Sequence, residues 1–469
     1  CVNKSMGNRE NNDQTPAKNN KEITGLSPEF LSFFNEAMHA ERVEEVRELT
    51  GTLHHSDLAD LLEGMAVERR EWLIELLRED LNPNMIAELD ESLLGQLADQ
   101  IGIQEMAEAV AEMDTDDAVD VVEELAIKDQ LEILDALPHD DRLLIEEGLS
   151  YPEDSAGRLM QREAVGVPSH WNVGQAIDFL RKERDLPRDF FDIFLVDSTD
   201  VPVGSIPLSR IMRAHRHVAL NALMVVEMKT VPVEMDQEDV AFLFRQRDLV
   251  SAPVVDNSAK LVGVITIDDV VDVIHEENEE DIMRLAGVGE DDDLYDAVIS
   301  TTRSRFSWLL IHLVAAISAA YVISLFTETI EELVFLAVLM PIVATMGGTA
   351  SVQALTVVVR AIAMKELTAE NAFRTIRKEV AVGLFNGIIF AILIGTVAWG
   401  WFGSPALGGV IALAIIINFL AAGLSGSALP VILNHLGFDP AIASSAFLTS
   451  ITDVLGFYVF LGLATLLLL

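Results

Sequence analysis

The chain has 469 residues, half of them hydrophobic, yet its 75 Asp and Glu against 32 Lys and Arg give a formal net charge of −43. The acidic excess precedes Ser300, because residues 300–469 hold 7 basic and 8 acidic side chains, and 25 basic and 67 acidic ones come before them. A front part this negative excludes nucleic acid as a partner, since phosphate binding needs Lys and Arg, and it favours cations. The only cysteine, Cys1, excludes an internal disulfide and a CxxC metal or redox site.

The first two segments are predicted to be a tail and a helical domain. Residues 1–24 are polar and are expected to form a disordered tail. Residues 25–150 are rich in Leu, Ala and Glu at helical spacing, and SDLADLLEGM at 56–65 returns as DDAVDVVEEL at 116–125. An all-α domain of stacked helical units is predicted. It has no nucleophile with a base and no phosphate loop, so no enzyme is expected.

Residues 151–283 change to short β-branched segments that alternate with helical ones. FDIFLVD followed by VPVGSIPLSRI predicts strand, strand and helix, and SAPVVDNSAKLVGVITIDDVVDVI repeats that order about 58 residues later. This repeated βαββα pattern resembles a tandem pair of CBS modules. The resemblance implies an α/β sensor rather than an enzyme, of a kind that often binds an adenosine nucleotide.

A dense acidic segment ends the CBS-like region. Its members are Asp268, Asp269, Asp272, Glu276, Glu277, Glu279, Glu280 and Asp281. Oxygen ligands suit hard divalent cations, and Mg²⁺ keeps most of its water when one or two carboxylates hold it. An exposed acidic helix is the other interpretation, and both stay open here.

The back part is predicted to be a membrane domain of five helices, since about 20 apolar residues cross a bilayer. The expected spans are 306–326, 333–364 (broken by Pro341 and the Gly347-Gly348 pair), 380–402, 407–433 and 441–469. Basic residues mark the cytoplasmic side, namely Arg303, Arg305, Arg360, Lys365, Arg374, Arg377 and Lys378. The amino terminus and the acidic region are therefore expected in the cytoplasm.

Asp453, in LTSITDVLGF, lies inside the fifth apolar segment. A carboxylate at this depth is costly, and such residues usually face a water-filled path or a partner. A carboxylate held neutral or hydrogen-bonded to Thr449 and Thr452 is the alternative. With no Lys or Arg at membrane depth, a cation is the natural counter-charge.

Together, YPEDSAGRLM, the CBS-like pair ending DDVVDVIHEENEEDIMRLAGV, MPIVATMGGTASVQ and FDPAIASSAFLTSITDVLGF resemble the MgtE family of magnesium channels over residues 25–469. The resemblance implies a fold of four parts: a helical N domain, a CBS pair, a linking helix at 284–305 and a transmembrane domain at 306–469. It implies a homodimer in the plasma membrane that takes up Mg²⁺ through a pore between subunits, with Asp453 as the main ion-binding carboxylate.

The resemblance further implies a gate that cytoplasmic Mg²⁺ closes. The regulatory acids by motif position are Asp116, Asp120, Asp236, Asp268, Asp269, Asp272, Glu276, Glu277 and Glu280. The pore lining is expected to include Gly347, Gly348, Thr349, Gln353, Ser445 and Thr449. Where the family motif usually reads GGNxGxQ, this chain has Thr349 and Ser351 in place of the asparagine and the second glycine. Permeation is expected to survive, whereas selectivity among Mg²⁺, Co²⁺ and Mn²⁺ is left open.

Two other functions share this composition. One is a proton-coupled transporter of divalent metals, which would use protonation of Asp453 to drive transport. The other is a transport-inactive Mg²⁺ sensor that keeps only the CBS switch.

Overall fold

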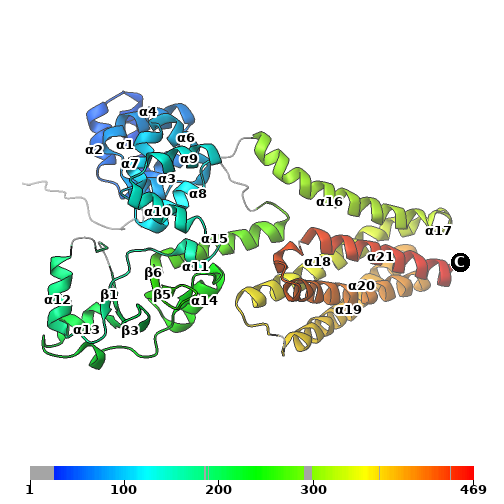
Figure 1. Cartoon of the computed structure of the whole chain (residues 1–469). Coiled ribbons are helices and arrows are strands. Elements are labelled where there is room, and N and C mark those ends of the chain that lie inside the picture. The colour runs from blue at the N-terminus through cyan, green and yellow to red at the C-terminus, as the bar shows by residue number, and fades with distance from the viewer. Residues whose placement is uncertain (1–25, 184–185, 188–189, 290–297, 369, 444) are drawn as a thin grey trace, which may run out of the picture. The chain divides into compact units, whose positions relative to one another are not determined.

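The computed structural model describes residues 26–183, 186–187, 190–289, 298–368, 370–443 and 445–469 (Figure 1). The tail predicted at 1–24 lies outside the described residues. The chain forms two compact units. The first runs to Met228 and adds Pro232–Glu234 and Pro253–Val264, and the second comprises Lys229–Val231, Met235–Ala252 and Ile265–Leu469.

The first part of the first unit is all-helical, as predicted. Its elements are α1 (Pro28–His39), α2 (Val43–Thr50), α3 (His55–Glu63), α4 (Val67–Leu77), η1 (Arg78–Asp80), α5 (Pro83–Ala87), α6 (Glu91–Ile101), α7 (Ile103–Val110), α8 (Thr115–Glu123), α9 (Ile127–Ala136) and α10 (His139–Gly148). The repeated segments fall on α3 and α8, which bury Leu61 and Leu62 in one case and Val121 and Val122 in the other. Each helix is too short to be stable alone and is held by this shared apolar core.

The CBS-like region folds as the predicted βαββα repeat. After α11 (Ala156–Leu159), the first copy is β1 (Gly166–Pro168), α12 (Val173–Lys182), β2 (Asp192–Val196), β3 (Pro202–Pro207) and α13 (Leu208–Arg213), followed by η2 (Leu220–Ala222). The second is β4 (Val231–Pro232), α14 (Gln237–Arg247), β5 (Ser251–Val255), β6 (Leu261–Thr266) and α15 (Ile267–Ala286). The strands form two sheets in the orders β1-β2-β3 and β4-β5-β6. In the first sheet β1 is parallel to β2, and β3 is antiparallel to β2.

The predicted linking helix at 284–305 lies only partly within the described residues. α15 continues to Ala286 and ends at Gly287, whose φ of 76° is a left-handed conformation that favours glycine. The next described helix, α16 (Val298–Ser324), includes the last residues of the predicted range. Residues 290–297 lie outside the described part of the chain.

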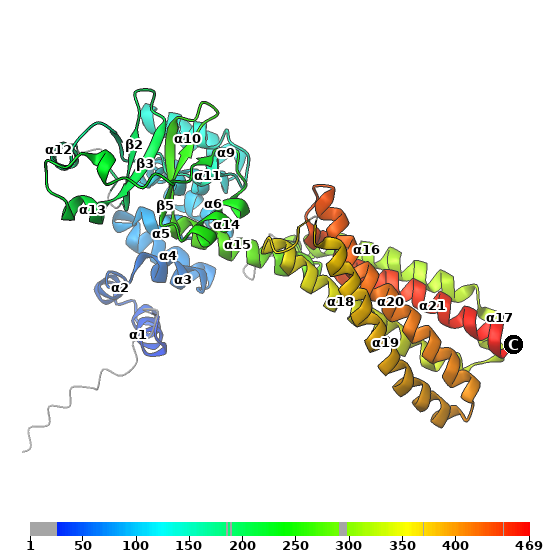
Figure 2. The ribbon, with the colours of Figure 1, turned by 90° about the horizontal axis from the view of Figure 1, so that it is seen from below.

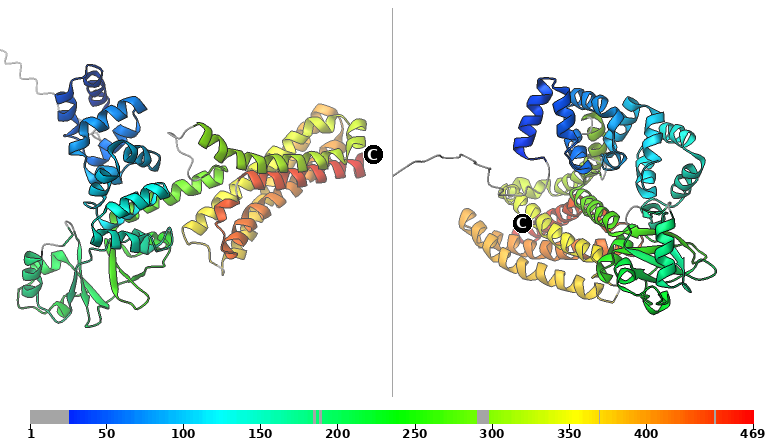
Figure 3. Two further views of the ribbon diagram at one scale, coloured as in Figure 1. Left: turned by 45° about the horizontal axis from the view of Figure 1, so that its top comes forward. Right: turned by 90° about the vertical axis from the view of Figure 1, so that its left-hand side faces the viewer.

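Among the described residues of the second unit, five helices are long and apolar enough to span a membrane, as predicted. The spans are Thr301–Ser324 in α16, α18 (Phe335–Ala363), α19 (Ala372–Phe402), α20 (Pro405–His435) and α21 (Ser445–Leu468). The connections include α17 (Thr327–Glu332) and η3 (Pro440–Ile442). Figures 2 and 3 show α18, α20 and α21 side by side, with α19 packed on α20 and α16 along α21.

Two expectations about these spans are wrong. Pro341 and the glycine pair do not break the second span, because α18 runs through them as one helix. Proline and glycine are tolerated in membrane helices where neighbouring elements satisfy the freed backbone groups. The third span begins at Ala372, eight residues before the expected position, because the helix continues through Arg374, Arg377 and Lys378 although the apolar run does not.

Candidate ion-conducting site and acidic regulatory residues

Asp453 lies on α21 at four-residue spacing from Thr449 and Ser445, which places the three residues on one face of that helix. The hydroxyl of Thr449 donates to the carbonyl oxygen of Ser445 at 2.7 Å and therefore does not donate to Asp453. Oδ1 of Asp453 is buried and has no hydrogen-bond partner among the described residues. The alternative of a carboxylate bonded to Thr449 or Thr452 is therefore not what the structure has, since both hydroxyls donate within their own helix.

Two close contacts set the register between α18 and α21. A Cβ added to Gly348 would lie 2.9 Å from Cγ2 of Thr449, and one added to Gly456 would lie 3.2 Å from Cγ1 of Val343. The helices are therefore antiparallel, since the later residue of α18 pairs with the earlier residue of α21. Asp453 lies between Thr449 and Gly456, so this register brings it level with Thr345.

A polar stripe runs along the exposed face of α18. Thr345, Thr349 and Gln353 follow one another at four-residue spacing, and all three are exposed in the single chain. The hydroxyl of Thr349 donates to the carbonyl oxygen of Thr345 at 2.8 Å, so its oxygen keeps accepting capacity. Thr345 was not among the predicted pore residues, although its spacing from Thr349 and Gln353 was a signal for it.

Asn418 of α20 is a buried polar residue, 1% exposed, where α18, α20 and α21 meet. Its Nδ2 donates to the carbonyl oxygen of Val343 at 2.9 Å, whereas its Oδ1 is buried without a hydrogen-bond partner among the described residues. Side chains at Gly347 or Gly456 would clash with its carboxamide. Gly347 and Gly348, both buried, therefore serve helix packing rather than an exposed lining.

Ser351, one of the two departures from the family motif, is fully buried. Its hydroxyl turns back to the carbonyl oxygen of Gly348 at 2.8 Å. A Cβ added to Gly426 of α20 would clash with the backbone oxygen of Ser351. Gly426 thus lets α20 approach the backbone of α18 closely at Ser351.

The predicted regulatory acids of the helical domain lie on α8. Asp116 is buried at 8% exposure, whereas Asp120 is exposed. Just beyond it, burial together with the carboxylates of Glu91 and Asp120 raises the pKa of Glu124 to about 8. Glu123 forms an ion pair with Arg158, and burial raises the pKa of this glutamate although the guanidinium opposes the shift. Part of this acidic surface therefore holds protons near neutral pH.

Several predicted regulatory acids of the CBS-like region make hydrogen bonds at the start of a helix. Asp236 is the N-cap of α14 and accepts from the backbone N–H of Glu238 at 2.9 Å. Asp269 completes a capping box with Thr266, whose hydroxyl also donates to Asp268. Capping does not by itself remove a carboxylate from metal binding, since each has two oxygens. Further along α15, Asp272 and Glu276 are exposed.

Basic side chains of the membrane-domain ends and of α15 neutralise other acids of the second unit. Lys365, which follows α18, forms an ion pair with Asp239 and lies 3.9 Å from Glu238 of α14. Burial raises the pKa of Glu238 to about 7, although Lys365 opposes the shift. Gln237 donates to Glu277 of α15 at 3.1 Å.

A second ion-pair cluster ties α15 to η3. Arg284 pairs with Glu280 on its own helix and with Asp439 at 2.5 Å. Burial and the nearby Asp439 raise the pKa of Asp281 above its usual range, although Arg284 opposes the shift. Sequence reasoning missed these ion pairs. Lys365 lies 126 positions from Asp239, and Asp439 lies 155 positions from Arg284. Arg284 itself stands just after the acidic segment and was not predicted as a partner for it.

No group of three or more His, Cys, Asp or Glu side chains within the described residues is arranged to hold a metal ion. The predicted regulatory acids are therefore not assembled into one ready-made cage in the described part of the chain. Their regulatory role stays a prediction.

Five membrane-spanning helices with a carboxylate at membrane depth, joined to an acidic helical domain and a CBS pair, define a multi-pass membrane transport protein. A sequence profile described as the MgtE divalent cation transporter matches residues 340–463. Profiles for the MgtE intracellular N domain and the CBS domain match residues 53–154 and 220–276.

Curated relatives agree with these profiles. The magnesium transporter MgtE of Bacillus subtilis is 29% identical over 424 residues, which are 90% of this chain and 94% of the relative. That of Thermus thermophilus is 32% identical over 327 residues, 69% of this chain and 72% of the relative. The solved cytosolic domain of the Mg²⁺ channel MgtE in complex with ATP is 26% identical and covers 51% of this chain and 98% of its own, with a TM-score of 0.48. This chain belongs to the MgtE family of magnesium transporters.

Proposed function

We propose that this protein carries Mg²⁺ into the cell through a pore lined by Asp453, Thr449 and Ser445 of α21 and by Thr345, Thr349 and Gln353 of α18. The observation that carries the proposal is the carboxylate of Asp453, which lies at membrane depth with a buried oxygen that accepts no hydrogen bond among the described residues. Such a group needs a positive counter-charge. A hydrated Mg²⁺ supplies it, because the ion keeps most of its water and needs only one or two carboxylates.

The pore is completed by a second copy of the chain. In a single chain the stripe of Thr345, Thr349 and Gln353 is exposed on a membrane-spanning helix, where contact with lipid would leave its polar groups without water or a partner. A homodimer would place two such stripes and two Asp453 carboxylates around one water-filled path. The membrane potential then supplies the driving force, about 2.3 kcal/mol per elementary charge per 100 mV.

Cytoplasmic Mg²⁺ closes this path by bridging acids of the cytoplasmic domains. Support comes from the clustering of carboxylates. Besides burial, the charges of Glu91 and Asp120 raise the pKa of Glu124, and those of Glu277 and Asp236 raise the pKa of Glu238. A divalent ion would relieve this repulsion between like charges. The gate requires that Mg²⁺ bind the closed state more tightly than the open state. The proposed orientation, with a cytoplasmic amino terminus in the plasma membrane, follows the basic residues around α18 and α19.

Uptake of Mg²⁺ into proteoliposomes that hold the purified protein tests the proposal and its alternatives. The channel account predicts uptake that falls as Mg²⁺ rises on the cytoplasmic face and that is unchanged when a pH gradient is collapsed. Uptake that requires the pH gradient would favour the proton-coupled transporter. Metal-dependent compaction without any uptake would favour the sensor. Adenosine-nucleotide binding at the CBS pair stays a prediction.

A further inference from the structure

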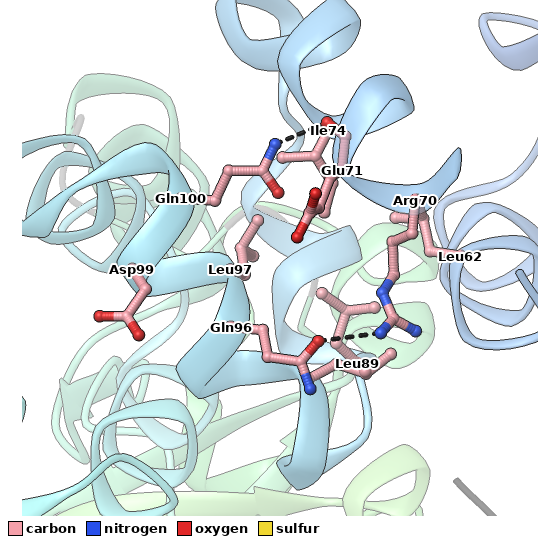
Figure 4. A pocket seen from close by; sticks show the side chains of 10 residues that line it. Leu62, Arg70, Glu71, Ile74, Leu89, Gln96, Leu97, Asp99 and Gln100 are labelled. Carbon is pink, nitrogen blue, oxygen red and sulfur yellow. Dashed lines mark hydrogen bonds between the residues drawn. The ribbon is translucent and has the colours of Figure 1, made fainter. Parts of the chain in front are cut away.

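A pocket of about 350 Å³ opens between α4 and α6 of the helical domain, and none of the residues assigned above to ion binding lines it (Figure 4). Its floor is apolar and consists of core side chains, namely Leu62, Ile74, Leu89, Leu93 and Leu97. Its polar lining comes from Arg70 and Glu71 of α4 and from Gln96, Asp99 and Gln100 of α6. The volume is within the range of small-molecule sites, about 300–1,000 Å³.

Arg70 is the unusual member of this lining. It is only 6% exposed, and the one hydrogen bond of its side chain among the described residues joins Nη2 to Oε1 of Gln96 at 2.9 Å. A guanidinium has five N–H donors and is always charged. Removing such a charge from water costs several kcal/mol unless an opposite charge is near. Gln96 is neutral, so the described structure does not offset that cost.

Arg70 lacks a counter-charge although the domain as a whole is rich in acidic residues. Residues 26–150 hold 34 Asp and Glu against 7 Lys and Arg, and five of those seven pair with a carboxylate, namely Arg42, Arg47, Arg78, Lys128 and Arg142. The neighbouring Arg69 is exposed and contacts Asn35 and His39. Arg70 is thus the buried member of the seven, and it forms no ion pair with a carboxylate among the described residues.

The opposite end of the pocket has acid character. Figure 4 shows the carboxylate of Glu71 beside Gln100, with Arg70 further along the pocket near Leu89 and Gln96. Gln100 is held there by a 2.6 Å hydrogen bond from its Nε2 to the carbonyl oxygen of Glu71. A free anion would meet Glu71 and the negative field of the whole domain. A ligand with a positive group at one end and a carboxylate at the other avoids both problems.

We propose that this pocket binds a small zwitterion of the amino-acid and short-peptide class. The ligand's carboxylate pairs with Arg70, its ammonium group lies toward Glu71, and its apolar side chains cover the leucine floor. Planar guanidinium groups bind carboxylates through two parallel hydrogen bonds, which gives the site its orientation. The helical domain would thereby respond to a second ligand besides a divalent cation.

Isothermal titration calorimetry on the full-length protein in detergent tests the proposal, with L-leucine and L-leucyl-L-leucine as probes. We expect saturable binding of at least one probe. Leucinamide and N-acetylleucine, which lack the carboxylate and the ammonium respectively, should each bind at least tenfold more weakly than leucine. No saturable heat from either zwitterion, or equal binding of the three leucine compounds, would overturn the proposal.

Arg70→Met and Arg69→Met form a matched pair, since both arginines lie on α4 and only Arg70 lines the pocket. We expect Arg70→Met to abolish probe binding while its melting temperature without probe stays at or above that of wild type, because an uncompensated buried charge is removed. Arg69→Met should bind as wild type does. Should Arg70→Met fail to fold, Glu71→Gln must still weaken leucine binding at least fivefold without changing the response to N-acetylleucinamide, which carries neither charge. An unchanged leucine affinity would contradict the site. These measurements read binding and are independent of Mg²⁺ transport.

Discussion

The carboxamide of Asn418 on α20 occupies the space that a side chain at position 347 of α18 would need, and Gly347 is what lets these two helices meet. The same carboxamide donates to Val343 and lies against Gly456 of α21. One buried polar residue therefore fixes three helices at the depth where Asp453 and Thr345 are level.

Gly347→Ala should destabilise the membrane domain, because the new methyl group displaces Asn418 from its place between the helices. Overpacking of this kind costs about 1–3 kcal/mol. The melting temperature of the purified protein in detergent should fall below that of wild type. Gly409→Ala on α20 is the control, because an added Cβ there meets nothing within 4 Å. Equal melting temperatures of the two variants would contradict the contact.

The proposed dimer predicts cross-linking between copies at Thr349. The chain's only cysteine is Cys1, so Cys1→Ser gives a cysteine-free background. On that background Thr349→Cys should form an intermolecular disulfide in membranes treated with a thiol oxidant, since two exposed stripes would face one another. Leu393→Cys on α19, also exposed at membrane depth, serves as the control and should stay monomeric. Cross-linking at Leu393 rather than Thr349 would place the interface elsewhere.

Glu124 predicts a pH dependence of stability. Its pKa is about 8 in the folded protein against an ordinary 4.5, so between these values the folded state binds more protons than the unfolded state. The free energy of unfolding therefore falls as pH rises from about 4.5 to about 8, and the loss is complete above that range. Glu124→Gln should be more stable than wild type at pH 9, by about 1–2 kcal/mol once solvent screening of this partly exposed group is allowed for. The difference should vanish near pH 4.

Urea unfolding at both pH values measures this effect. Glu112→Gln, which changes an exposed acid of the same domain, is the control and should follow wild type. A Glu124→Gln variant that loses stability at pH 9 would show that the carboxylate is favourable there, contrary to the account.

Lys365 predicts a change in Mg²⁺ sensitivity. Its ammonium group neutralises Asp239 and Glu238 and so competes with a divalent ion for the acids of α14 and α15. The measurement is the Mg²⁺ concentration at which half of the cytoplasmic part is protected from protease. Lys365→Met should lower this midpoint by about threefold to tenfold, because one unit of opposing charge is worth roughly 1 kcal/mol near a surface. Lys378→Met, at the start of α19, should leave the midpoint unchanged. A higher midpoint for Lys365→Met would mean that the lysine supports the closed state.

Sequence reasoning predicted the features that depend on local pattern. The five spans follow from hydropathy, and the βαββα repeat from SAPVVD and its earlier copy FDIFLVD. It failed at the start of α19, because Arg374, Arg377 and Lys378 precede the apolar run but already belong to the helix. The capping roles of Asp236 and Asp269 were not foreseen, because an acid before a helix reads equally as a cap or a ligand.

Contacts between distant segments lay beyond the sequence. The meeting of Asn418 with Gly347 and Gly456 depends on which faces of three helices oppose one another, and hydrophobic spacing does not specify this when a helix is apolar on all sides. The pairing of Lys365 with Asp239 was also out of reach, because it joins residues 126 positions apart and depends on how the helices pack.

Uptake of Mg²⁺ by Asp453→Asn in proteoliposomes tests the central claim most directly. Asparagine keeps the shape of the side chain and removes the charge, so any effect reports the charge itself. Glu328→Gln, an acid of α17, is the control and should transport as wild type does. The account predicts that Asp453→Asn loses at least nine-tenths of wild-type uptake while it melts at or above the wild-type temperature. Undiminished uptake by folded Asp453→Asn would show that the ion does not depend on this carboxylate.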